Sequence, residues 1–129
     1  MKKIVIVDDS TDLLEVLKYF LEEKGYEVVT ATSKQDLEEV IEIFSPDLII
    51  LDIYLQGEDG REICKNLRKY EETKYLCILM FSASARDLTN YKAYGADGFI
   101  EKPFGLNEIV NTIEATLEVC RDYYPVQDK

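Results

Sequence analysis

Short, strongly apolar runs alternate along this chain with longer segments in which apolar residues recur at helical spacing. The runs cover residues 4–7, 28–29, 48–51, 76–81 and 99–100. Several of them are apolar at every position, as expected for strands that are buried on both faces of a parallel sheet. The alternation predicts an α/β fold. Five strands form an open, doubly wound parallel sheet, and five helices pack on it.

The segments between these runs carry apolar residues on one helical face and end signals at their boundaries. Gly25 is a typical stop for the first helix. Ser33 and Asp36 form a capping pattern before the second helix, which Pro46 ends. Asp59 is expected to open the third helix. The apolar positions of the last three predicted helices are Ile63, Leu67 and Tyr70, then Leu88, Tyr91 and Tyr94 before Gly95, then Leu106, Ile109, Val110, Ile113 and Leu117.

The charge balance limits the partners that the chain can have. Its 129 residues, one domain's worth, include 26 acidic and 15 basic side chains, for a net charge of −11. General binding to nucleic acid or to an anionic membrane is disfavoured, because both require a cationic surface. No apolar run approaches the roughly 20 residues of a bilayer span, and the N-terminus does not resemble a signal peptide. We therefore expect a cytoplasmic protein that binds neither nucleic acid nor membrane.

The chain has three cysteines, at positions 64, 77 and 120, and no histidine. An odd number of cysteines without Cys-x-x-Cys spacing argues against a zinc site and against a disulfide framework. The cysteines are therefore expected to be buried thiols in a reducing compartment. A metal site, if the chain has one, must use oxygen ligands, which points to a hard cation such as Mg²⁺.

Polar side chains follow four of the five predicted strands. Asp8 and Asp9 follow the first strand, Asp52 the third, Ser82 the fourth and Lys102 the fifth. Each has an ordinary structural explanation, as a helix cap, a turn former or a solvated lysine. Because a parallel sheet brings the carboxyl ends of its strands together, that explanation would require four coincidences. The pattern favours one shared site.

Such a cluster suits phosphoryl transfer. Three crowded carboxylates repel one another unless a cation shares the site, and Mg²⁺ binds both carboxylate and phosphoryl oxygens. Phosphoryl transfer depends mainly on positioning and charge stabilisation, which a divalent cation and a lysine supply without histidine. An aspartate can act directly as the covalent acceptor.

The same residues, taken as a set, resemble a known family, the response-regulator receiver domain of two-component signalling. The resemblance runs from about residue 3 to residue 117, and the segment 94–104 is especially similar. It implies the flavodoxin-like strand order 2-1-3-4-5. The residues that carry it are Asp8, Asp9, Asp52, Gly60, Ser82, Lys102, Pro103 and Phe104.

The resemblance also implies roles at the acidic site. Asp52 matches the phosphoacceptor, and Asp9 and Asp52 match the direct carboxylate ligands of Mg²⁺. The backbone carbonyl of Tyr54 matches a further metal ligand, and Asp8 matches a position that acts through metal-bound water. Lys102 matches the lysine that pairs with the phosphoryl group. The chain would therefore catalyse only its own phosphotransfer and dephosphorylation, and is not expected to be an enzyme in the usual sense.

A conformational switch is implied by three further matches. Ser82 matches the hydroxyl that moves toward the phosphate, Phe99 the aromatic switch, and Pro103 a proline that follows a cis peptide bond. Two positions depart from the family pattern. Gln56 stands where proline is common, which predicts a less rigid loop, and Phe99 lacks the hydroxyl of the commoner tyrosine.

The implied partners are a sensor histidine kinase or histidine phosphotransferase, and a downstream protein bound through the face of helix four, strand five and helix five. We expect a receiver domain over residues 1–121 and a short tail, residues 122–129, without an output domain. This would be a free-standing regulator, either of the chemotaxis type or a phosphorelay shuttle; a domain cut from a longer chain is the alternative.

Three other classes are weighed against this interpretation. A haloacid-dehalogenase-type phosphatase separates its two aspartates by one residue, whereas Asp8 and Asp9 are adjacent. A flavin- or nucleotide-binding module would need a glycine-rich loop after the first strand, where residues 8–12 are polar and acidic. A degenerate receiver that acts only by protein binding is disfavoured by the intact acidic set.

Overall fold

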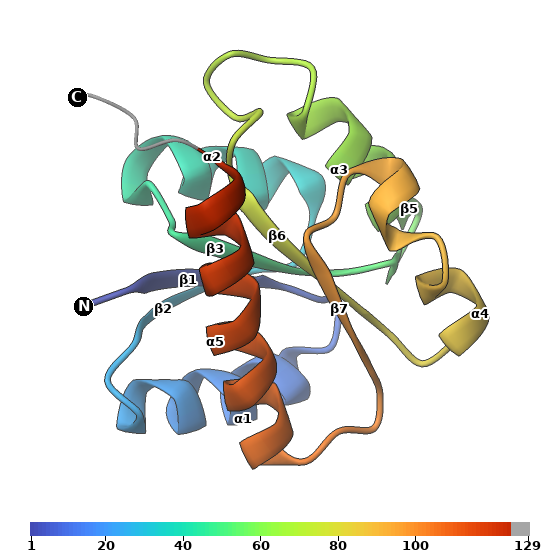
Figure 1. The fold of residues 1–129 in the computed structure, drawn as a ribbon. Coiled ribbons are helices and arrows are strands. Elements are labelled where there is room, and N and C mark those ends of the chain that lie inside the picture. Colours follow the sequence, from blue (N-terminus) through green and yellow to red (C-terminus); the bar gives the residue numbers. More distant parts are fainter. Residues whose placement is uncertain (125–129) are drawn as a thin grey trace.

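The computed structural model describes residues 1–124, which form a central five-stranded sheet covered by helices on both faces (Figure 1). All five strands are parallel, and their order is β2-β1-β3-β6-β7. This order confirms the predicted doubly wound, flavodoxin-like sheet. The strands are β1 (Lys3–Val7), β2 (Glu27–Ala31), β3 (Leu48–Asp52), β6 (Cys77–Ser82) and β7 (Gly98–Glu101).

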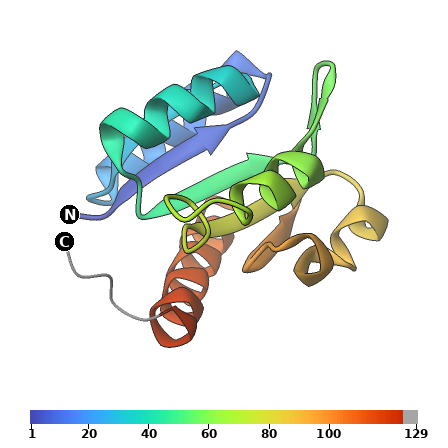
Figure 2. The ribbon, with the colours of Figure 1, turned by 90° about the horizontal axis from the view of Figure 1, so that it is seen from above.

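The two faces of the sheet belong to two separate apolar clusters. The side chains of Val5, Ile49 and Ile78 point to the face that α2 (Lys34–Phe44) and α3 (Gly60–Leu67) cover. Alternate positions on the same strands point to the opposite face. There they pack against α1 (Thr11–Glu23) and α5 (Leu106–Tyr123), and Figure 2 shows the two layers on either side of the sheet. Burial on both faces explains why these strands read as continuous apolar runs.

Most of the predicted helix ends are confirmed. The side chains of Ser33 and Asp59 accept hydrogen bonds from the first-turn amides of α2 and α3, as N-caps do. Gly25 follows α1 with a φ of +96°, a left-handed conformation that glycine adopts without strain. The capping pattern at α2 is half formed, because the Asp36 carboxylate accepts from Thr32 rather than from Ser33.

Four features differ from the predicted elements. The fourth helix divides into α4 (Ala85–Leu88) and a 3₁₀ turn, η1 (Tyr91–Tyr94), with Thr89 and Asn90 between them. The Thr89 side chain competes with helical hydrogen bonding, because its hydroxyl donates to the Arg86 carbonyl. A hairpin of β4 (Tyr54–Leu55) and β5 (Glu58–Asp59) follows β3. Tyr70 lies beyond the end of α3. The last helix extends to Tyr123, and residues 125–129 of the predicted tail lie outside the described residues.

The prediction that all three cysteines are thiols is wrong for two of them. Cys77, at the start of β6, forms a disulfide with Cys120 near the end of α5, and their Cα atoms are 5.9 Å apart. The partners are separated by 43 positions, and only the packing of α5 on the sheet brings them within bonding distance. Cys64 is a buried free thiol, as predicted.

None of the described helices is long and apolar enough to cross a membrane.

Gly60 provides a test of how closely α3 approaches β3. A Cβ atom at this position would collide with the backbone carbonyl of Asp52, and the Gly60 amide already donates to Ile53 at 2.6 Å. Because backbone atoms cannot yield as a flexible side chain would, we expect Gly60→Ala to destabilise the protein by roughly 1–3 kcal/mol in urea denaturation. Gly105→Ser is the control: its Cβ meets open space and serine is a good N-cap, so its effect should stay within about 0.5 kcal/mol. Equal stability of the two variants would contradict the close contact.

Candidate functional site

Three carboxylates meet at the carboxyl edge of the sheet. Asp8 and Asp9 follow β1, and Asp52 is the last residue of β3, which pairs with β1. Each of them offers a carboxylate oxygen within 4.8 Å of the others. Asp8 and Asp52 are buried, with 1% and 6% of their surface exposed, whereas Asp9 faces solvent. The structure therefore brings together the acidic residues that the strand ends predicted.

Lys102 lies against both buried carboxylates. Its Nζ is 2.8 Å from Asp8 Oδ2 and 3.2 Å from Asp52 Oδ2, and it sits 4.4 Å from the centroid of the Phe81 ring. Burial disfavours the ammonium, but the hydrogen bond to Asp8 and the charge of Asp52 outweigh that effect and raise the pKa of Lys102. One cation thus partly balances three acids, and the described site carries a net negative charge.

The pKa of the Asp52 carboxyl is raised, whereas the pKa of an ion-paired acid is usually lowered. Burial is the largest cause and, together with the neighbouring Asp8 charge, raises the pKa of Asp52 to about 6. The Lys102 ammonium and the Tyr54 amide, which donates to Asp52 Oδ1 at 3.3 Å, lower the pKa but do not cancel the burial effect. A divalent cation would supply the missing positive charge.

The donors present fit Mg²⁺. The cation takes oxygen ligands, usually one or two carboxylates with water completing the shell, and the cluster of Asp8, Asp9 and Asp52 offers such oxygens at one point. Tyr54 starts the β4–β5 hairpin two residues after Asp52, so its backbone lies beside the cluster. Asp8 is already engaged by the Ser10 amide at 2.8 Å and by Lys102. The Asp8 carboxylate is thus held in place by groups of the protein itself.

The predicted switch residues lie at the end of β6, within β7 and just after β7, and their environments differ. Ser82 is fully buried at the end of β6, and its Oγ accepts a hydrogen bond from the Ser84 amide at 3.1 Å. Phe99 on β7 is 46% exposed, and its ring centroid lies 4.8 Å from that of Tyr91. The peptide bond between Lys102 and Pro103 is cis, as the resemblance implied.

One polar cluster next to the site was not predicted from the sequence. The Tyr54 hydroxyl donates to Asp87 of α4, and Arg61 of α3 lies 3.6 Å from Asp87 and 2.9 Å from Asp59. These contacts tie the hairpin, α3 and α4 together beside the acidic edge. The residues are spread over 33 positions, and no spacing in the sequence marks them as neighbours.

The fold and site together define a class: doubly wound α/β proteins with an acidic, lysine-paired site at the carboxyl edge of the sheet. Comparison with known proteins narrows the class, since the family model of the response regulator receiver domain matches residues 4–114. The chain therefore belongs to the response regulator receiver domain family. It is a signalling domain rather than an enzyme in the usual sense.

Solved structures agree with this assignment. A candidate response regulator from Chloroflexus aurantiacus is 33% identical, with a TM-score of 0.84, and the match covers 91% of this chain and 98% of that one. The chemotaxis response regulator CheY4 of Vibrio cholerae is 29% identical with a TM-score of 0.83, covering 90% and 98%. A two-component response regulator from Clostridium difficile is also 29% identical with a TM-score of 0.83, covering 95% and 99%.

The raised pKa of Asp52 predicts a pH dependence of stability in metal-free buffer. Below pH 4 the carboxyl is protonated in both states; between pH 4 and about 6 the folded protein retains a proton that the unfolded chain has lost. This group therefore makes the wild type less stable as pH rises through about 6. Asp52→Asn cannot ionise, so its stability relative to wild type should improve by on the order of 2 kcal/mol between pH 4.5 and 7.5.

Urea denaturation in EDTA at the two pH values measures this difference. Asp122→Asn, an exposed acid on α5, controls for the loss of one negative charge and should track the wild type. If Asp52→Asn also tracks the wild type across this range, burial does not control the ionisation of Asp52.

Proposed function

We propose that this chain is a phosphoacceptor in two-component signalling. Asp52 receives a phosphoryl group from a phosphohistidine on a sensor kinase or phosphotransferase, in a reaction that requires Mg²⁺. The phosphorylated form then binds a downstream protein differently from the unphosphorylated form. Because such donors receive their phosphoryl group from ATP, we infer a cytoplasmic location. The observation that carries the proposal is the convergence of Asp8, Asp9, Asp52 and Lys102 within one small site.

The acceptor step follows from the position of Asp52. Its carboxylate oxygen forms a bond to phosphorus while the bond from phosphorus to the donor imidazole nitrogen breaks, and the bonding electrons leave with the imidazole. Bound Mg²⁺, held by Asp9, Asp52 and the Tyr54 carbonyl with Asp8 acting through water, would neutralise charge on the phosphoryl oxygens. The Lys102 ammonium already lies 3.2 Å from Asp52 Oδ2, so it can pair with the incoming group without a long movement.

We propose that the side chains of Ser82 and Phe99 change position when Asp52 is phosphorylated. As an acceptor of the Ser84 amide, the buried Ser82 hydroxyl keeps its own proton for a phosphoryl oxygen. Movement of the Ser82 hydroxyl toward the phosphoryl oxygen would open space into which the half-exposed Phe99 ring can turn. Phe99 lines a surface hollow of about 300 Å³ together with Leu88 and Tyr91. We propose that the surface formed by α4, β7 and α5 changes at this point and binds the downstream partner.

The acceptor assignment is tested by chemical phosphorylation. Incubation with acetyl phosphate and Mg²⁺ should add one phosphoryl group that hydroxylamine removes, as expected for an acyl phosphate. Asp52→Asn should abolish the added mass in intact-protein mass spectrometry, and Asp122→Asn should retain it. A phosphoryl group that persists on Asp52→Asn, or that resists hydroxylamine, would falsify the proposal.

Substitutions of Lys102 and of Ser82 should have different effects. Lys102→Ala removes a charge that alanine cannot replace, so phosphorylation should slow by roughly tenfold or more. Ser82→Ala removes a neutral hydrogen bond worth about 0.5–1.5 kcal/mol, which is comparable to a modest population bias between two conformers. It should therefore still accept phosphate while the response of Phe99 is reduced.

Aromatic NMR spectra with and without beryllofluoride measure this response. Ser84→Ala is the matched control, because its side chain makes no capping hydrogen bond at α4 and should leave the response intact. If Ser82→Ala shows the full wild-type shift at Phe99, the hydroxyl does not couple the two sites.

A further inference from the structure

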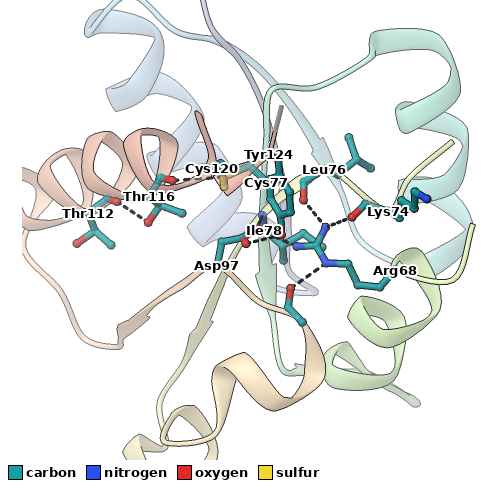
Figure 3. Close-up of a disulfide and its surroundings, with 11 residues drawn as sticks. Arg68, Lys74, Leu76, Cys77, Ile78, Asp97, Thr112, Thr116, Cys120 and Tyr124 are labelled. Carbon is teal, nitrogen blue, oxygen red and sulfur yellow. Dashed lines mark hydrogen bonds and ion pairs between the residues drawn. A yellow bond between two sulfur atoms is a disulfide. The ribbon is translucent and has the colours of Figure 1, made fainter. Parts of the chain in front are cut away.

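The Cys77–Cys120 disulfide joins the sheet to its last helix at the edge opposite the acidic site. Cys77 is the first residue of β6, and Ser82, at the acidic edge, is the last. Cys120 lies in the final turn of α5, so the bond fixes the end of the helix to the start of the strand (Figure 3).

We propose that the Cys77–Cys120 pair is a site of thiol–disulfide exchange with a dithiol reductant, and that its oxidation state sets how firmly the C-terminal half of α5 is held against the sheet. In a reducing compartment, a disulfide of this kind is transient and responds to the redox balance rather than serving as a permanent brace. The reducing compartment rests on the cytoplasmic location inferred with the proposed function, but the measurements below do not involve phosphorylation.

The pair is isolated from the third cysteine. Cys64 belongs to the apolar cluster on one face of the sheet, whereas Cys77 and Cys120 belong to the cluster on the other face. Burial raises the pKa of the Cys64 thiol to about 12, so it remains an unreactive thiol. Exchange within the chain is thus blocked by the sheet, and the reductant must come from outside.

Metal binding is a poorer explanation of the same residues. Asp97 offers a carboxylate oxygen close to both sulfurs. That carboxylate already pairs with Arg68 at 2.8 Å and accepts from the Ile78 amide at 2.9 Å and the Tyr124 hydroxyl at 2.7 Å. A cation would have to displace these partners, and the Arg68 guanidinium would repel it.

Tyr124 controls access to the bond. Cys77 and Cys120 are only 5% and 7% exposed, so a reductant reaches them when the last turn of α5 opens. The Tyr124 amide donates to the Cys120 carbonyl at 2.8 Å, and its hydroxyl connects this turn to Asp97. Loss of the hydroxyl contact should make opening easier and reduction faster.

The fold can accommodate the reduced state as well. The Cys77 sulfur lies 3.6 Å from the Thr116 carbonyl of α5, so a thiol at this position has an acceptor in place. The contacts from Asp97 to Arg68 and Tyr124 also remain. Reduction is therefore expected to loosen the end of α5 without unfolding the domain.

The exchange balances as a two-electron reaction. One thiolate of the reductant attacks one sulfur of the pair, a mixed disulfide forms, and the other sulfur leaves as a thiolate that takes up a proton. The second thiol of the reductant then resolves the mixed disulfide. The products are two cysteine thiols in the chain and one oxidised dithiol.

Three measurements on the full chain test the proposal, with dithiothreitol as the reductant. Alkylation after denaturation should label one cysteine in the oxidised protein and three after reduction. Reduction should lower the melting temperature by roughly 5–15 °C. Amide exchange should accelerate by roughly tenfold or more over residues 116–123, while amides of β1 and β3 change little.

Matched variants separate the bond from its surroundings. Cys120→Ser should melt at the same temperature with and without reductant, whereas Cys64→Ala should keep the redox-dependent shift. Tyr124→Phe should be reduced about tenfold faster than wild type, and Tyr123→Phe, an exposed neighbour, at the wild-type rate.

Three free thiols after incubation with oxidised glutathione would overturn the proposal. So would equal melting and equal α5 exchange in the two redox states of the wild type, and an unchanged reduction rate in Tyr124→Phe would overturn the role of Tyr124.

Discussion

The contact between one ammonium and two buried carboxylates is the constraint around which this domain is arranged. The carboxylates of Asp8 and Asp52 are buried at the ends of neighbouring strands, where the negative charge of each disfavours the ionisation of the other. Lys102 reaches both of them from the end of the edge strand β7, which lies beside β6. The remaining negative charge explains why this site suits a cation.

Most of this site could be predicted from the sequence, because a parallel sheet converts position along the chain into position in space. Each apolar run specified a strand, and the residue after the run was placed at a common edge. The same reasoning could not find the link between Cys77 and Cys120, which depends on how α5 lies across the sheet. It also missed the contact between Arg61 and Asp87, which joins side chains of two separate helices, α3 and α4.

Two ends of one strand carry different chemistry. β6 ends at the acidic site with Ser82 and begins at Cys77, and its residues between are fully buried on both faces. The proposed phosphoryl transfer and the proposed disulfide exchange therefore lie at opposite ends of one buried strand, the first beside Ser82 and the second at the end of α5.

The division of the predicted fourth helix has a consequence for local unfolding. A four-residue helix and a 3₁₀ turn close few backbone hydrogen bonds. Opening this segment breaks little of the sheet, because Leu88 and Tyr94 are its main buried anchors. This segment is thus expected to open locally at a low free-energy cost beside Phe99, where a change of shape disturbs little of the sheet.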